Sequence, residues 1–387
     1  MASYKKKFKN LNIGHYTNRS HMKITGIKVH ILRSEVYHHS PPCFIRIFTD
    51  EGIEGNTIIE ESIYGEELVR KFKVEKGWIK GKEFTKLIGA DPLDRENIEK
   101  SLWTQYFYQR HYVAVSSALD ECLWDIAGKF FKVPVYKLIG AYREKILAYA
   151  STQSYDNVED YKKIVEDCVN RGFKAIKIHP PKNWKKDIEL CKKVREWVGD
   201  EIILMHDPFN AYTREEAIRV GRILEKLDFY WFEDPIPTED MDGLANLCRS
   251  LDIDIVMGEQ IYNHQSYTEL IRRGATDRLR CIDVNVGGIT GILKVAHLAE
   301  AFNMKCEPHS WGNPWQQAAH LHVMLAIRNC DFFEMPVPQG IFDIGTRDVI
   351  RIDKEGYVHA PKKPGLGIDP DWDEIEKQTI KTISWPE

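Results

Sequence analysis

Short apolar runs that each end in an acidic residue recur at a constant interval in the middle of the chain. They read IILMHDP, FYWFEDP and IDIVMGEQ, and their acids are Asp207, Glu233 and Glu259, spaced 26 residues apart. A (β/α) barrel of about 250 residues contains eight units of one strand and one helix. The interval therefore predicts such units, with a functional residue at the end of each strand.

The same alternation extends on both sides of these runs. Eight strand-like segments follow one another from about residue 146, separated by helical stretches: ILAYAS, FKAIKIH, EIILMHD, FYWFEDP, IDIVMGE, RCIDVNVGG, MKCEPHS and DFFEMP. Alternating strands and amphipathic helices are typical of a parallel barrel. We therefore expect an α/β fold, a (β/α) barrel of the modified TIM type, over residues 146–345.

The segments outside the barrel have other patterns. Residues 22–145 begin with two runs of alternating strand character, MKITGIKVHILRS and CFIRIFTDEGIEG, and continue with helical patterning that includes a strong amphipathic helix over 116–140, interrupted after Phe131. Strands followed by helices predict an α+β domain. Residues 1–21 are expected to be a tail, and residues 346–387 to leave the barrel.

Composition excludes several classes of protein. The 387 residues carry a net charge of −4 and no apolar stretch of membrane-spanning length, so neither nucleic acid nor a membrane is an expected partner. The basic N-terminus lacks the apolar region of a secretory signal. The eight cysteines form no C-x-x-C pair, which indicates buried free thiols and a cytoplasmic protein.

Three carboxylates at the ends of consecutive strands predict a metal site. The strand ends of such a barrel form its active site, so Asp207, Glu233 and Glu259 should converge there. An all-oxygen set suits Mg²⁺, with Mn²⁺ as a possible substitute. The alternative is that each acid caps its own helix or pairs with a nearby Lys or Arg. Three acids in register favour the metal.

Four more residues at strand ends are candidates for proton transfer. Lys177 and His179 are two apart and so point to the same face of their strand. Either could act as a base, but Lys177 could instead be a counter-ion and His179 a passive hydrogen-bonding group. Asp283 and His309, expected on the next two strands, suggest a dyad in which the carboxylate orients the imidazole. His309 alone could be a core histidine.

Glu334 follows on the last strand, as a general acid, a hydrogen-bonding partner of the substrate or a structural residue. Together these groups suit one type of reaction. A base removes the proton α to a carboxylate, and the resulting enediolate is stabilised by a metal ion and nearby cations. Reprotonation would give racemisation, whereas loss of a β-hydroxyl would give a keto acid.

This set of residues resembles the enolase superfamily, and specifically its mandelate racemase-like branch, over residues 22–373. The resemblance implies that the first domain caps the barrel and that the C-terminal segment returns to the cap. It implies that Asp207, Glu233 and Glu259 bind Mg²⁺ and that Asp283 and His309 form the general-base dyad. Homo-oligomers, from dimer to octamer, are also implied.

The resemblance extends to Lys177 and Glu334, but His179 stands where racemases of this branch have a second lysine. The departure favours dehydration of a sugar acid to a 2-keto-3-deoxy acid, for which the dyad suffices. A racemase, epimerase or cycloisomerase is the first alternative, and a non-catalytic metal-binding barrel is the second. Polar and ring-bearing residues in the loops could contact the sugar acid or be ordinary surface or packing residues: His38, His39, Tyr64, Asn210, Tyr212 and Trp311.

Overall fold

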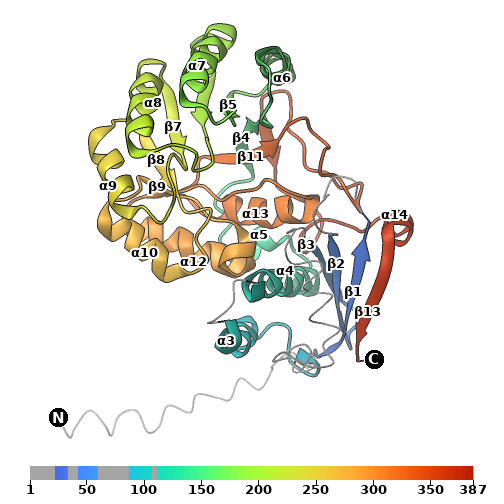
Figure 1. The fold of residues 1–387 in the computed structure, drawn as a ribbon. Coiled ribbons are helices and arrows are strands. Elements are labelled where there is room, and N and C mark those ends of the chain that lie inside the picture. Colours follow the sequence, from blue (N-terminus) through green and yellow to red (C-terminus); the bar gives the residue numbers. More distant parts are fainter. Residues whose placement is uncertain (1–21, 34–41, 60–86, 107–110, 387) are drawn as a thin grey trace, which may run out of the picture.

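A small antiparallel sheet and a curled parallel sheet make up the structure (Figure 1). The computed structural model describes residues 22–33, 42–59, 87–106 and 111–386. The small sheet has the strand order β13-β1-β2-β3. Its strands are β1 Ile24–Leu32, β2 Cys43–Thr49, β3 Glu54–Ile59 and β13 Thr379–Trp385. The predicted antiparallel pair at the start of the chain is confirmed by the β1–β2 ladder.

The long helix α4, His111–Phe131, packs against the small sheet. The two approach so closely that a Cβ added to Gly55 of β3 would lie 2.0 Å from the carbonyl oxygen of Cys122. Only glycine fits this contact. The helix ends at Phe131, as predicted, where Lys132 has a positive φ of 57°. The flanking helices are α3 Arg95–Tyr106 and α5 Val135–Ile139.

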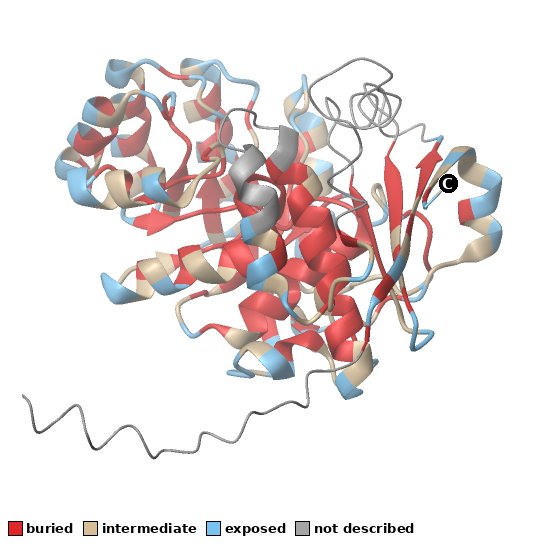
Figure 2. Ribbon diagram, turned by 90° about the horizontal axis from the view of Figure 1, so that it is seen from below, coloured by how far each residue is buried: buried red, intermediate tan, exposed pale blue. Residues whose placement is uncertain are grey.

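The curled sheet confirms the predicted barrel, with eight parallel strands surrounded by helices. The strands are β4 Lys145–Ser151, β5 Ala175–Ile178, β6 Ile203–His206, β7 Phe229–Glu233, β8 Asp254–Met257, β9 Arg278–Leu279, β10 Lys305–Cys306 and β11 Phe332–Pro336. The helices between and after them are α6 Val158–Arg171, α7 Trp184–Val198, α8 Arg214–Lys226, α9 Met241–Ser250, α10 His264–Arg273, α12 Gly288–Ala301 and α13 Pro314–Ala326. Figure 2 shows that the strands are buried and the outward turns of the helices exposed.

Polar residues start most of the barrel helices. The side chain of the residue before each helix accepts a hydrogen bond from a backbone N–H of the first turn, which would otherwise have no partner. These N-cap residues are Asn157, Asn183, Thr213, Asp240, Asn263 and Asn313. Each N-cap residue fixes the position at which a strand-end loop stops and the next helix begins.

The sixth unit departs from the predicted pattern. The whole run RCIDVNVGG was expected to be a strand, but β9 ends at Leu279 and the chain enters the short helix α11, Asp283–Val286. Gly287 and Gly288 follow with φ of 96° and 70°, a conformation that favours glycine, and they redirect the chain into α12. The prediction that Asp283 lies on a strand is therefore wrong.

Side chains close the barrel between its two end strands. The described strands β10 and β11 share no backbone ladder. A backbone bond crosses this boundary, from the N–H of Cys306 to the carbonyl of Asn329 at 2.8 Å. In addition, Glu307 accepts hydrogen bonds from the backbone N–H of Asp331, at 3.2 and 3.3 Å. The hydroxyl of Ser310 accepts from the backbone N–H of Glu334 at 3.1 Å and donates to its carbonyl oxygen at 2.9 Å. We call this boundary the side-chain seam.

Alternate residues of the barrel strands fill its interior in layers. The lower layer is apolar and consists of Tyr149, Ala175, Met205, Trp231, Val256 and Phe332. Two residues further along five of these strands, the side chains become polar or charged: Ser151, Lys177, Asp207, Glu233 and Glu334. A charged layer therefore rests on an apolar floor at the carboxyl ends of the strands.

The last part of the chain joins both sheets. Strand β12, Tyr357–His359, pairs antiparallel with β4, and after α14, Trp372–Gln378, strand β13 pairs antiparallel with β1. We therefore propose that residues 346–387 form a separate segment that returns to the cap. None of the described helices is both long enough and apolar enough to span a bilayer.

Asp120 of α4 should make stability depend on pH. Burial raises its pKa to about 7, against hydrogen bonds from Thr290 that act to lower it. The folded state then binds a proton that the unfolded state releases, so this contribution to stability is complete below about pH 4 and is lost as the pH rises through about 7. Asp120→Asn imitates the protonated acid and should flatten that part of the melting-temperature profile. An unchanged slope in Asp120→Asn would contradict the assignment.

Candidate active site

Two cations and two carboxylates occupy the centre of the charged layer. The Nζ of Lys177 lies 2.8 Å from Oε1 of Glu233 and 3.0 Å from Oε1 of Glu334. The guanidinium of Arg280 lies 2.6 Å from the same oxygen of Glu233 and 2.5 Å from Oε2 of Glu334. No side chain of the four is more than 1% exposed. We call these four residues the ion-pair cluster.

Arg280 is the residue that the sequence interpretation missed. It follows β9 in the run LRCID, and its backbone N–H donates to the carbonyl of Met257, so the strand pairing continues through it. A cation in an apolar run at a strand end is the signal that could have identified it.

Lys177 is a cation in this environment. Burial and Arg280 act to lower its pKa, but Glu233 and Glu334 outweigh them and hold the pKa well above its ordinary value. A lysine that keeps its proton cannot accept another. The structure therefore favours the counter-ion interpretation of Lys177 over a role as base.

His179 and Asp207 form a second pair above the cluster. The imidazole Nε2 lies 3.0 Å from Oδ2 of Asp207, and Nδ1 lies 2.6 Å from the carbonyl oxygen of Thr152. Burial alone would raise the pKa of Asp207, but Lys177 and His179 lower it well below its usual value. Asp207 is therefore an anion. Both ring nitrogens of His179 have a partner, Asp207 for Nε2 and the carbonyl of Thr152 for Nδ1.

His309 has a free ring nitrogen. Its Nε2 lies 3.7 Å from Oε2 of Glu259 and 3.9 Å from Oε2 of Glu334, while Nδ1 is buried and has no partner among the described residues. Burial lowers its pKa, although the two glutamates act to raise it. A neutral imidazole at the strand ends can accept a proton, which is what the sequence interpretation requires of it.

The predicted Asp283–His309 pair is not formed in this structure. The carboxylate of Asp283 accepts a hydrogen bond from Nε2 of Gln316 at 2.8 Å and lies 3.6 Å from Nε2 of His320. The physical reason is the early end of β9, which places Asp283 at the start of α11, against α4 and α13. The two residues remain neighbours, because the backbone N–H of His309 donates to the carbonyl of Cys281 at 2.7 Å.

The donor set fits a divalent cation in charge and chemistry. Four carboxylates, Asp207, Glu233, Glu259 and Glu334, surround two permanent cations, Lys177 and Arg280. In addition, both carboxylate oxygens of Asp234 are buried without a partner in the described chain. The carboxylates are paired with the cations. Among the described residues, no group of three Asp, Glu, His or Cys side chains is already arranged to bind a metal ion. Binding an ion would therefore require them to turn.

The predicted substrate-binding residues have mixed outcomes. The ring of Trp311 lies edge-on to His179, with ring centroids 5.3 Å apart, so it borders the site. Asn210 has a positive φ of 61° and a buried, unpartnered Oδ1. The expected role of Tyr212 in substrate binding is contradicted. Its side chain is buried, and its hydroxyl donates to Asp187 at 2.7 Å and lies 3.0 Å from Nε2 of His206. His38, His39 and Tyr64 lie outside the described residues.

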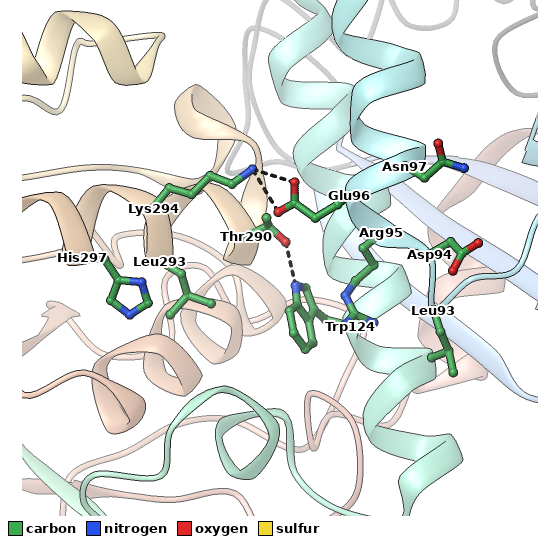
Figure 3. Close-up of a pocket in the computed structure, with 10 residues that line it drawn as sticks. All are labelled: Leu93, Asp94, Arg95, Glu96, Asn97, Trp124, Thr290, Leu293, Lys294 and His297. Atoms are coloured by element: carbon green, nitrogen blue, oxygen red, sulfur yellow. Dashed lines mark hydrogen bonds and ion pairs between the residues drawn. The ribbon is translucent and has the colours of Figure 1, made fainter. Parts of the chain in front are cut away.

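A separate cavity of about 680 Å³ lies where α3 and α4 meet α12. Figure 3 shows Lys294 reaching Glu96 across it, and Trp124 bonded to Thr290 at its wall. Arg95 stacks on Trp124, with its guanidinium 3.7 Å from the ring centroid. None of the residues that line it belongs to the charged layer.

The structure is a (β/α) barrel with carboxylates, cations and histidines at its strand ends. Its cap is built from both ends of the chain, and together these features define a class of capped barrel proteins. Residues 160–374 match the family described as enolase C-terminal domain-like, and residues 26–140 match the mandelate racemase/muconate lactonizing enzyme N-terminal domain. The chain belongs to the mandelate racemase-like branch of the enolase superfamily.

Several relatives are named as acid-sugar enzymes. An arabinonate dehydratase of Saccharolobus solfataricus is 34% identical over 286 residues, which cover 71% of this chain and 76% of the relative. A D-galactarolactone cycloisomerase of Agrobacterium fabrum is 28% identical, covering 95% of this chain and all of the relative. The structure of a D-glucarate dehydratase from Agrobacterium tumefaciens, complexed with magnesium, is 34% identical with a TM-score of 0.82, covering 94% of this chain and 100% of that one.

Arg280 should be essential for folding stability. Arg280→Met leaves Glu233 and Glu334 buried with one cation between them, and breaking a buried ion pair costs about 3–5 kcal/mol. The free energy of unfolding by urea measures this loss, and adding Glu334→Gln should recover part of it. Arg328→Met, a matched change at an exposed ion pair with Glu300, should have little effect. Equal losses in Arg280→Met and Arg328→Met would contradict the importance of the ion-pair cluster.

Proposed function

We propose that the protein is a Mg²⁺-dependent hydro-lyase that dehydrates a sugar acid to a 2-keto-3-deoxy acid through an enediolate. Asp207, Glu233 and Glu259 would hold the metal ion, and His309 would be the general base. The observation that carries the proposal is the imidazole of His309, whose buried Nδ1 has no partner among the described residues, beside a layer in which carboxylates outnumber cations. Such a layer suits a divalent cation, and the imidazole suits proton removal.

The role of each side chain follows from its charge. Bound Mg²⁺ would supply a fixed positive charge that orients the substrate carboxylate and stabilises negative charge on it. Neutral His309 takes the proton from the α-carbon, and the bond electrons pass to the carboxylate to form the enediolate. Lys177 and Arg280, held as cations beneath it, favour this build-up of charge because they are buried and already oriented.

Elimination then completes the reaction. The electrons of the enediolate return to form a double bond between the α- and β-carbons as the β-hydroxyl leaves. The protonated His309 gives its proton to that hydroxyl, so the product leaving is water and the base is regenerated. The enol that remains tautomerises to the 2-keto acid. Glu334, bonded to Lys177, Arg280 and Ser151, would hold the cations and not transfer a proton.

The names of the relatives support this choice of substrate. The arabinonate and D-glucarate dehydratases are named for sugar acids, and the latter structure contains magnesium. His179, whose two ring nitrogens are both engaged, is poorly placed as a second base. A single base is enough for dehydration, whereas racemisation by two bases needs a second one on the opposite face of the substrate.

Replacement of His309 tests the proposal. In an assay of 2-keto acid formation with Mg²⁺ and a panel of sugar acids, His309→Asn should lose at least about 100-fold in kcat, because it removes the general base. Mg²⁺ binding by calorimetry should persist in His309→Asn and fall in Asp207→Asn. His297→Asn, a matched change at an exposed histidine of α12, should retain activity. Wild-type protein that neither binds Mg²⁺ nor turns over any sugar acid would favour the non-catalytic alternative.

The relative named as a cycloisomerase keeps one alternative in view. In a cycloisomerisation by this chain, the α-proton would be lost without loss of water. Incubation of candidate sugar acids in D₂O separates the two reactions. Dehydration should give a 2-keto acid. Deuterium at the α-carbon of recovered substrate or of an isomer, with no 2-keto acid formed, would refute dehydration and leave the α-proton step intact.

A further inference from the structure

One face of α4 is polar and meets the sixth unit of the barrel. Ser117, Asp120, Glu121 and Trp124 are spaced at i, i+3, i+4 and i+7, which places them on one side of the helix. Asp120 accepts hydrogen bonds from the backbone N–H and hydroxyl of Thr290, at 2.9 and 2.6 Å. Trp124 donates to the same hydroxyl at 2.9 Å (Figure 3). Side chains of α4 in the cap therefore hydrogen-bond to the start of α12.

Ser117 and Glu121 reach the neighbouring helix α11. The hydroxyl of Ser117 lies 2.7 Å from the carbonyl oxygen of Asp283. The carboxyl group of Glu121 is within hydrogen-bonding reach of the carboxyl group of Asp283. Glu121 is 2% exposed, and its Oε2 accepts a hydrogen bond from Thr57 of β3 at 2.5 Å. Its Oε1 is buried and receives no hydrogen bond from any described donor.

Two carboxyl groups in contact inside a protein cannot both be ionised without a large cost, so a proton must lie between them. Glu121 is the group that keeps it. Burial first, and then the charge of Asp283, raise the pKa of Glu121 well above its usual value, and Asp120 adds to the effect. Gln316 donates to Oδ1 of Asp283 at 2.8 Å, so this carboxylate already acts as a hydrogen-bond acceptor.

We propose that Glu121 is a positioning residue for the general base. As a neutral acid it donates from Oε1 to Asp283, and so the cap holds in place the start of α11, two residues after Cys281, whose carbonyl accepts the backbone N–H of His309. The proposal rests on the proposed function, in which His309 takes the α-proton. It concerns a residue of the cap that touches neither the substrate site nor the ion-pair cluster.

The backbone connects this contact to the base. His309 donates its N–H to the carbonyl of Cys281, two residues before Asp283, and its Nδ1 is buried without a partner among the described residues. Asp283 is fixed on one side by α4 and on the other by Gln316 and by the nitrogen of His320, which accepts from its backbone N–H at 3.3 Å. Loss of the Glu121 proton donor would leave a buried carboxylate with fewer donors, and Asp283 would shift or take up a proton itself.

Two variants separate hydrogen bonding from charge. Glu121→Gln keeps a donor toward Asp283 and an acceptor toward Thr57, so kcat should stay within about threefold of wild type. Glu121→Leu removes the donor, and because a hydrogen bond to a charged group contributes about 1.5–3 kcal/mol, kcat should fall by about 10- to 100-fold. KM should change by less than about twofold in both, since no substrate contact is lost. Asp120→Asn, on the same helix face, should leave kcat unchanged.

Infrared difference spectra provide a readout that does not depend on turnover. Near neutral pH, wild-type protein minus Glu121→Gln should show the C=O band of one neutral carboxyl group, and Asp283→Asn should shift that band. Absence of the band would overturn the proposal. So would wild-type kcat in Glu121→Leu, or an equal loss of kcat in Glu121→Gln and Glu121→Leu. If wild-type protein turns over no sugar acid, the proposed function fails, and the infrared band alone decides whether Glu121 holds the proton. Should Glu121→Leu not fold, Glu121→Gln and the spectra still decide.

Discussion

The ion pairs at the centre of the barrel are the interaction on which the rest of the site depends. Lys177 and Arg280 each contact both Glu233 and Glu334, and all four are removed from solvent. Buried charges are tolerated only when they are paired. The apolar floor below them excludes water, so the same pairing that makes folding possible keeps two cations fixed where negative charge would develop during reaction.

The cap and the barrel are linked through both apolar and polar contacts of α4. Asp120, Glu121 and Asp283 are buried acids at this contact, and burial raises the pKa of Asp120 to about 7 and that of Glu121 well above its usual value. A purely apolar contact between the two domains could slide. Hydrogen bonds to Thr290 and Asp283 fix the register of α4 against α11 and α12 instead.

The sequence predicts the barrel well because its signal is repeated. A run of buried apolar residues ending in a polar one, eight times over, specifies strands, their order and the edge where the polar residues gather. It predicts the sixth unit poorly, because RCIDVNVGG has the composition of a strand, and the helix α11 depends on two glycines and on contacts with α4 and α13. The sequence therefore predicts that residues 177, 207, 233, 259 and 334 lie at strand ends. It does not predict that Gln316 is the residue that donates to Asp283.

Arg280 and Tyr212 show the other limit of sequence interpretation. Arg280 belongs to no expected motif, and only the folded barrel shows that its guanidinium joins carboxylates from three strands. Tyr212 lies in a loop after a strand, yet its hydroxyl donates to Asp187 of α7. Which way a loop side chain turns depends on packing partners that are distant in sequence, and no local pattern contains them.

The side-chain seam ties the proposed base to the ion pairs. Seven boundaries between neighbouring barrel strands are backbone ladders, whereas across the eighth the side chains of Glu307 and Ser310 supply hydrogen bonds beside a backbone bond from Cys306 to Asn329. Because Ser310 follows His309 and bonds the backbone of Glu334, a change in spacing at the seam would move His309 relative to the ion-pair cluster.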